Sequence, residues 1–452
     1  MGVRSGFPYF EVEFDKEGEP SDPKQAKALK ASLKPGEPTD LIVISHGWNN
    51  DMAEARSLYA KFLASFRKRL DAGVPGIKGR KFAVLAVLWP SKKFADRELI
   101  PSGAAGVGSS ITNKAIIDQI QALKGFFNSP TADANLEKAK ALVSKLESSP
   151  AAQKEFANLI RLAVTPEAAK GEEGAEDASK DFFKLGGDEV MKRMAKPVAM
   201  VAPVPGKGGG AGMRGPAGGP GIGQGGAAGI GSFFSGVKAA AVNVLNFTTY
   251  YQMKARAGKV GSRGVAPLIR EIKTLHAPLK LHLVGHSFGG RLVTAVVSAL
   301  DKNGSNPTSV SVDSLALLQA AFSHYAFSDK WDGTHAGAFR NVLAGKQVKG
   351  PIIVTCTAND KAVGLAYPMA SLLAGQVAAG IGDKNDKYGG IGRNGAQMTP
   401  EAVNTKLLAA GKPYEFTAGK LHNLLADEFV KDHSDVGGEE VAYAVLAAIS
   451  RT

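Results

Sequence analysis

Cysteine, long apolar runs and dense basic tracts are scarce or absent in this chain of 452 residues. The single cysteine, Cys356, excludes an intrachain disulfide and a cysteine-based metal site. No stretch approaches about 18 consecutive apolar residues, so no transmembrane helix is expected. The first twenty residues lack the apolar core of a signal peptide. These absences predict a cytoplasmic protein, although export by a route without a signal peptide stays open.

The distribution of charge and the spacing of the histidines argue against a nucleic-acid-binding protein and against a metalloprotein. A net charge of +13 suits an anionic partner such as nucleic acid or a lipid surface. The basic residues are spread along the chain without interleaved aromatics, so nucleic-acid binding is not expected, and a transient membrane-surface contact is the lesser alternative. The histidines show no H-E-x-x-H or comparable spacing. We therefore expect no metal and no cofactor.

Strand and helix patterns alternate in two separate stretches of the chain. Apolar runs at 40–51 and 82–91 are typical of buried parallel strands, and an amphipathic helix is predicted between them at 52–70. The alternation resumes later, with helices predicted at 264–275, 289–300 and 437–450 and strands at 279–285, 314–321 and 351–360. This order predicts an α/β fold with a mostly parallel central sheet flanked by helices.

A long insertion separates the two stretches. Residues 105–200 contain amphipathic helical patterns, and glycine dominates 203–232, which predicts a loop because so little can be buried there. The sequence therefore predicts one core formed by 1–104 and 241–452. The helical insertion at 105–240, with its glycine-rich loop, is interpreted as a possible lid.

A serine stands between glycines where an apolar strand meets an apolar helix, in "GHSFG" at 285–289. A serine hydroxyl is a weak nucleophile unless a base takes its proton and its geometry is fixed. A sharp strand-to-helix turn fixes that geometry, and the crowding there requires glycine on either side. The motif predicts Ser287 as a catalytic nucleophile rather than a residue of a plain turn.

An oxyanion site is expected beside this serine. One donor is the main-chain N–H of Phe288, and a second is that of Trp48, in the loop "SHGWNN" after an apolar strand. Gly47 allows the loop to approach a substrate. His46, Gly47 and His286 are assigned to substrate binding, with His46 acting mainly as a brace of the loop.

The acid and the base should follow the serine in that order. Asp360 ends an apolar strand and is preferred over Asp329 and Asp332, which lie in an irregular polar stretch. His433 lies in a polar loop before the final helix and is preferred over His422, whose leucine neighbours are typical of a structural histidine.

With "SHGW", "GHSFGG", "TANDKAV" and "DHSDV" in this order, the chain resembles the α/β-hydrolase superfamily, and most closely bacterial esterase/lipase-like proteins with an HGW loop. The resemblance covers about 9–100 and 245–450. It implies a triad of Ser287, Asp360 and His433, with Trp48 and Phe288 as oxyanion donors. The insertion before the nucleophile strand departs from the pattern of many relatives.

Two segments beside these motifs have alternative interpretations. Residues 246–264 mix aromatic and basic side chains, either to meet an anionic head group or, as we prefer, to pack the aromatics inward beneath a solvated basic face. Ser323 and His324 follow a strand end and are expected to line the pocket.

The sequence therefore predicts a serine esterase or lipase that cleaves a small-molecule or lipid carboxylic ester through an acyl-enzyme, with no obligate protein partner. Two alternatives are kept. One is a phospholipase-type effector acting on membrane lipids, and the other is a non-catalytic scaffold with a vestigial triad.

Overall fold

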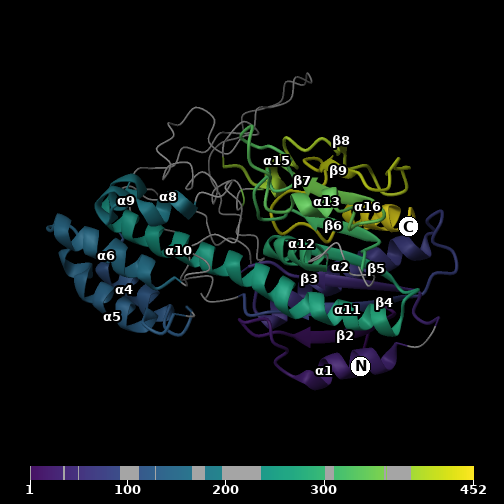
Figure 1. Ribbon diagram of the computed structural model, residues 1–452, viewed down its shortest axis with the longest axis horizontal. Coiled ribbons are helices and arrows are strands. Elements are labelled where there is room, and N and C mark those ends of the chain that lie inside the picture. Colours follow the sequence, from purple (N-terminus) through teal and green to yellow (C-terminus); the bar gives the residue numbers. More distant parts are fainter. Residues whose placement is uncertain are drawn as a thin grey trace, which may run out of the picture.

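The computed structural model describes residues 2–33, 36–48, 50–91, 111–127, 129–164, 179–195, 236–300, 310–360, 363 and 388–452. In these ranges one nine-stranded sheet has the order β1-β2-β4-β3-β5-β6-β7-β9-β8. Only β1 and β2 pair antiparallel. The predicted α/β architecture, a mostly parallel sheet flanked by helices, is confirmed (Figure 1). The glycine-rich loop predicted at 203–232 lies outside the described residues.

The strands are β1 (Gly2–Arg4), β2 (Phe7–Glu13), β3 (Asp40–Ser45), β4 (Phe82–Leu88), β5 (Lys280–His286), β6 (Ser314–Leu318), β7 (Ile352–Cys356), β8 (Ala402–Lys406) and β9 (Leu421–Leu425). The helices of the core are α1 (Pro23–Ser32), α2 (Met52–Asp71), α10 (Val237–Lys259), α11 (Ala266–Leu275), α12 (Phe288–Leu300), α13 (Arg340–Ala344), α15 (Ile391–Asn394) and α16 (Glu439–Ile449), with a π-helical stretch over Val260–Val265. The helices between β4 and α10 are α4 (Asn113–Ala122), α5 (Ala132–Leu142), α6 (Pro150–Leu162), α8 (Ser179–Lys184) and α9 (Gly187–Met194).

The central strands β3 to β7 are buried on both faces, as their continuous apolar runs predict. One face packs against α2 and α16 in a core that includes Phe62 and Leu446. The other face packs against α10, α11 and α12 in a second core that includes Met253 and Val293. The sheet is therefore the middle layer of three.

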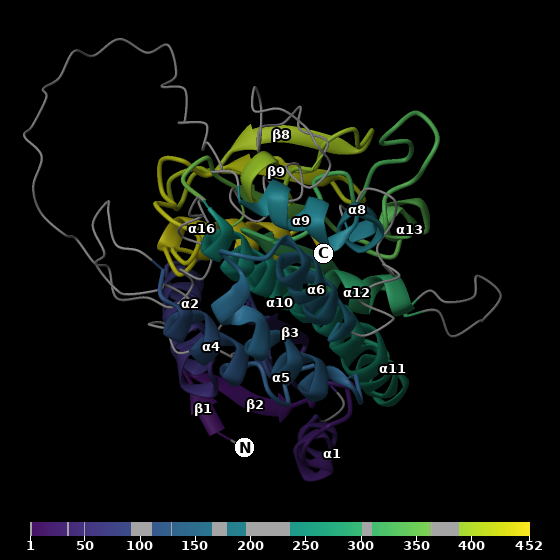
Figure 2. The same cartoon turned by 90° about the vertical axis from the view of Figure 1, so that its left-hand side faces the viewer.

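The predicted insertion is helical where it is described, and its helices α4 to α9 gather beyond one end of the sheet (Figures 1 and 2). The long helix α10 starts at Val237, before the expected boundary at 240, and runs from this group back along the core. Buried side chains of the insertion and of the sheet belong to one hydrophobic cluster. No described helix is long and apolar enough to cross a membrane.

The order of the strands changes direction between β3 and β5. The chain passes from β3 to β4 on one side of β3 and later to β5 on the other side. At such a switch of direction, ligands bind outside the carboxyl ends of parallel strands. The segments that follow β3, β5, β7 and β9 carry the catalytic and oxyanion candidates singled out in the sequence.

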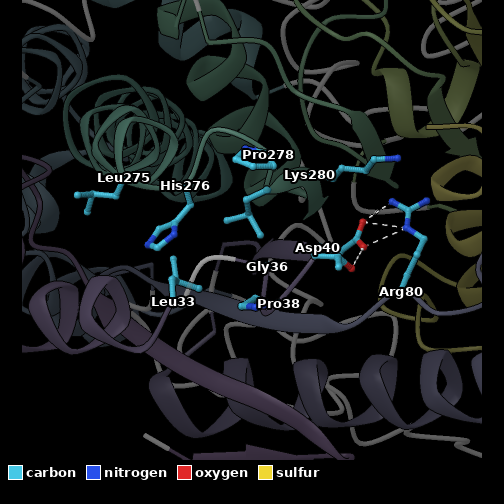
Figure 3. A pocket seen from close by; sticks show the side chains of 11 residues that line it. Leu33, Gly36, Pro38, Asp40, Arg80, Leu275, His276, Pro278 and Lys280 are labelled. Carbon is cyan, nitrogen blue, oxygen red and sulfur yellow. Dashed lines mark hydrogen bonds and ion pairs between the residues drawn. The ribbon is translucent and has the colours of Figure 1, made fainter.

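A separate hollow of about 250 Å³ lies at the opposite, amino-terminal edge (Figure 3). Its wall is mostly apolar, with Leu33 and Leu275 on one side and the charged Asp40 and Arg80 at the other. Both charged groups already bind one another.

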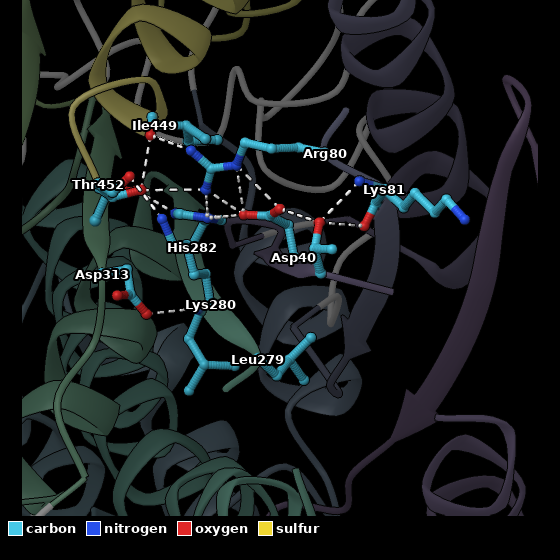
Figure 4. A network of polar contacts seen from close by, with 12 residues as sticks. Asp40, Arg80, Lys81, Leu279, Lys280, His282, Asp313, Ile449 and Thr452 are labelled. Carbon is cyan, nitrogen blue, oxygen red and sulfur yellow. Dashed lines mark hydrogen bonds and ion pairs between the residues drawn. The ribbon is translucent and has the colours of Figure 1, made fainter. Parts of the chain in front are cut away.

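Asp40 and Arg80 also belong to a buried network of polar contacts at this edge of the sheet (Figure 4). The carboxylate of Asp40 pairs with Arg80 and lies 2.8 Å from Nε2 of His282. On its other side, His282 Nδ1 lies 2.8 Å from Ser314 Oγ, and Arg80 also donates to the main-chain oxygen of Ile449. The network ties β3, β5 and β6 to the end of α16, so we interpret it as structural.

Candidate active site

Ser287 lies in a strained turn between β5 and α12. Its φ is 56°, a left-handed conformation that residues other than glycine rarely adopt. The N–H of Ser287 donates to the main-chain oxygen of Leu318 (3.1 Å), and the main-chain oxygen of Ser287 accepts from the N–H of Ala321 (3.0 Å). The end of β6 thus holds the strained backbone in place, and the serine is 6% exposed.

The flanking glycines are required by close packing. A Cβ at Gly285 would lie 2.3 Å from the oxygen of Gly289, and a Cβ at Gly289 would lie 2.2 Å from the oxygen of Ser45. Both distances are far below any real carbon–oxygen contact, so the crowding expected around the serine is present. The turn that the motif predicts is therefore the turn that the fold contains.

The expected acid and base meet at the same edge of the sheet. Nδ1 of His433 lies 2.8 Å from Oδ2 of Asp360, across 73 residues of sequence. Asp360 is fully buried, and its second oxygen accepts from the N–H of Val363 (2.9 Å). Because the carboxylate accepts from Nδ1–H, the neutral imidazole keeps its lone pair on Nε2. In a neutral ring, this pairing favours the tautomer that a general base requires.

The less favoured candidates lie elsewhere. His422 is in β9, where its Nε2 accepts from the N–H of Thr417 (3.0 Å) and its ring packs against Phe416. Asp332 pairs with His335 in an exposed loop, and Asp329 is exposed. Each has a structural or surface environment distinct from the Asp360–His433 pair.

Two residues that the sequence did not single out connect the acid to the base. Oδ1 of Asp427, after β9, accepts from Thr357 Oγ1 (2.7 Å) and from the N–H of Ala358 (2.8 Å). In return, the amide of Asn359 donates to the main-chain oxygens of Asp427 (3.1 Å) and Val430 (2.9 Å). These bonds hold the turn of Asp360 against the loop of His433. In the sequence, only their polar side chains just after two strands could have indicated this role.

The loop after β3 packs directly on the serine. A Cβ at Gly47 would lie 2.5 Å from the Cβ of Ser287. The next residue, Trp48, is therefore brought close to the serine by the loop after β3, the strand that pairs with β5. Phe288 is the first residue of α12, where the N–H groups have no partner within the helix. The two expected oxyanion donors thus belong to the two segments that meet at Ser287.

His46 braces this loop from inside the protein. Its ring is fully buried, its Nδ1 lies 2.9 Å from the oxygen of Gly47, and it stacks on Trp89 at 5.5 Å between centroids. Burial lowers the pKa of His46 to about 4, so the ring is neutral near neutral pH. The amide of Asn50 adds hydrogen bonds to the oxygens of Gly47 (3.3 Å) and Trp48 (3.2 Å). His46 has no exposed surface left for a substrate.

His286, which the sequence assigns to substrate binding, makes a contact within the protein. The ring is buried, and its Nε2 lies 2.7 Å from the main-chain oxygen of His433.

Three aromatic rings, two of them from the residues expected to donate to the oxyanion, form a wall beside Ser287. The ring centroids of Tyr250 and Phe288 are 5.1 Å apart, and that of Trp48 is 6.0 Å from Phe288 and 6.3 Å from Tyr250. Tyr250 comes from α10 and was not singled out individually in the sequence. The wall brings a helix that begins in the insertion into contact with the site.

The segment at 246–264 follows the preferred interpretation only in part. Its aromatic side chains pack inward, but the expected solvated basic face is wrong for Lys254 and Arg256, which are buried. Arg256 donates to the oxygens of Pro90 (2.8 Å) and Phe126 (2.7 Å), because a buried guanidinium needs acceptors. It thereby ties α10 to the end of β4 and to the insertion.

Ser323 and His324 are buried next to the 388–397 loop. The N–H of His324 donates to the oxygen of Gly389 (2.8 Å), and its Nδ1 lies 3.1 Å from the amide of Asn394. Their contacts hold this loop in place.

Comparisons with protein-family models, with curated proteins and with solved structures found no match to this chain. Within the described ranges, no group of three histidine, cysteine, aspartate or glutamate side chains could hold a metal ion.

Proposed function

We propose that this chain is a serine hydrolase with the α/β-hydrolase fold that cleaves carboxylic esters. One observation carries the proposal: the strained Ser287 after β5 and the 2.8 Å Asp360–His433 pair lie at the same carboxyl edge of one parallel sheet. A serine on a sharp strand-to-helix turn, followed in the chain by an acid and then a histidine, is the arrangement of this superfamily.

In the proposed reaction, Nε2 of His433 takes the proton of Ser287 while Oγ attacks the ester carbonyl. Asp360 holds Nδ1–H and stabilises the imidazolium that forms. The N–H groups of Trp48 and Phe288 donate to the oxyanion, and each such donor is typically worth about 3 kcal/mol in the transition state. His433 then protonates the leaving alcohol, and water releases the acid from the acyl-enzyme by the same steps.

The aromatic wall of Trp48, Tyr250 and Phe288 favours an apolar group on the ester. Because Tyr250 belongs to α10, the helical insertion is coupled to the wall and suits the role of a lid.

Labelling with a fluorophosphonate probe tests the proposal. The native chain should be labelled, and Ser287→Ala and His433→Ala should abolish labelling. His422→Ala replaces a histidine outside the site and should be labelled like the native chain. A folded native chain that takes no label would contradict the proposal and favour the scaffold alternative. A panel of p-nitrophenyl esters then gives the preferred acyl length.

The net charge of +13 favours a lipid substrate as the second candidate. In that case hydrolysis and binding should increase on anionic phospholipid vesicles relative to neutral ones, and binding should weaken with salt. Equal rates on both vesicle types would restrict the proposal to soluble esters.

A further inference from the structure

The residue before the proposed nucleophile makes a direct bond to the proposed base. His286 Nε2 lies 2.7 Å from the main-chain oxygen of His433, and the centroids of the two rings are 4.9 Å apart. A carbonyl oxygen only accepts hydrogen bonds, so Nε2 of His286 carries the proton and Nδ1 carries the lone pair. The last residue of β5 is thus a donor to the loop that carries the base.

The surroundings keep the His286 ring uncharged. It is 3% exposed, and its Nδ1 has no hydrogen-bond partner in the described part of the chain. Burial, together with the neighbouring His433, lowers the pKa of His286 to about 3, and the more distant His46 acts in the same direction. The carboxylate of Asp360 is hydrogen-bonded to Nδ1 of His433 and not to His286.

His433 is therefore held at two points by two different strands. Asp360, after β7, binds its side chain, and His286, at the end of β5, binds its main chain. Since Ser287 directly follows His286, the second bond links the position of the base to that of the nucleophile. Without it, the loop before α16 would lose its hydrogen bond to the nucleophile strand.

We propose that His286 is a positioning residue that fixes His433 relative to Ser287 through its Nε2–H bond to the main chain of His433. This inference rests on the proposed function. The uncharged ring suits the role, because a second positive charge at this distance would oppose the imidazolium that His433 forms during catalysis.

The experiment compares His286→Gln with His286→Asn and His286→Ala, using kcat and KM on the best p-nitrophenyl ester. The glutamine amide reaches about as far as Nε2 and keeps a donor, whereas the asparagine amide is too short. Glutamine should retain most of kcat, and asparagine and alanine should lower it about 10- to 100-fold with little change in KM, because small displacements of catalytic groups have effects of this size.

The control is His282→Gln, a second buried histidine on β5 but at its amino-terminal half. It should lower the melting temperature without changing kcat of the folded protein. If alanine does not fold, the glutamine–asparagine pair tests the same point.

The outcomes separate the two proposals. A native chain that takes no fluorophosphonate label overturns the hydrolase function itself. If the native chain is labelled but all three folded His286 variants have the native kcat, only the positioning role is overturned. An equal loss with glutamine and asparagine also overturns it, because the hydrogen bond would then not be the cause.

Discussion

Gly47 lies so close to Ser287 that a Cβ at position 47 would stand 2.5 Å from the Cβ of the serine and 3.0 Å from its Oγ. The two residues belong to loops after adjacent parallel strands, β3 and β5. Only a glycine hydrogen fits between them. The loop that carries the proposed oxyanion donor is thus in direct contact with the proposed nucleophile.

Gly47→Ala should therefore lower the rate of fluorophosphonate labelling by about 100-fold, because one segment must move away from the other. Overpacking should also cost about 1–3 kcal/mol of stability. Labelling rates and thermal unfolding measure the two effects separately. Gly438→Ala is the control, since a Cβ there meets only Glu440 at 3.6 Å. If Gly47→Ala is labelled at the native rate, the loop of Gly47 is not part of the active site.

Asp427 should act through one oxygen. Both of its side-chain hydrogen bonds, from Thr357 and Ala358, go to Oδ1. Asp427→Asn keeps an acceptor at that position and should retain most of the ester hydrolysis. Asp427→Ala removes it, so kcat should fall about 10-fold or more as the turn of Asp360 loosens. Similar kcat in both variants would show that the acid is held by other contacts.

Stability should fall in mild acid because of two buried histidines. The pKa of His46 is lowered to about 4 and that of His286 to about 3, against about 6.5 in the unfolded chain. Below pH 6.5 the unfolded state therefore binds protons that the folded state does not. Each histidine should lower the free energy of unfolding by about 1.4 kcal/mol per pH unit down to its folded pKa.

Urea unfolding at pH 7, 6 and 5 measures this slope. His46→Gln removes one of the two groups and should flatten the slope by about one proton. An unchanged slope would mean that His46 is protonated in the folded state.

The network around Asp40 should matter for stability and not for catalysis. Arg80→Ala leaves the fully buried Asp40 without its cation, which typically costs about 3–5 kcal/mol. Lys81→Ala removes the neighbouring but exposed pair with Glu37 and should cost less than about 1 kcal/mol. Chemical unfolding gives both values. The labelling rate of folded Arg80→Ala should match that of the native chain. A much lower labelling rate would contradict a purely structural role, because the network would then affect the site at the opposite edge of the sheet.

Strands buried on both faces were predictable from sequence, and edge strands were not. The apolar run at 40–51 contains β3 and the run at 279–285 covers all of β5 but its last residue, because a strand covered by helices on both faces is mostly apolar. The strand β8, "AVNTK", is exposed and polar, so its pattern does not differ from that of a loop. His422 was recognised as structural, but the strand β9 around it was not predicted.

The sequence by itself determined the chemistry that is available: a serine between obligatory glycines, an acid and a histidine after later strands, and a loop with glycine after an earlier strand. These are local patterns, because a turn or a buried strand constrains the residues within it. Only the tertiary structure decided that Asp360 and His433 pair across 73 residues, that His46 is enclosed, and that His286 binds the main chain of His433. Those contacts depend on which strands are neighbours in the sheet, and strand order is set by the packing of the whole core and not by any short stretch of residues.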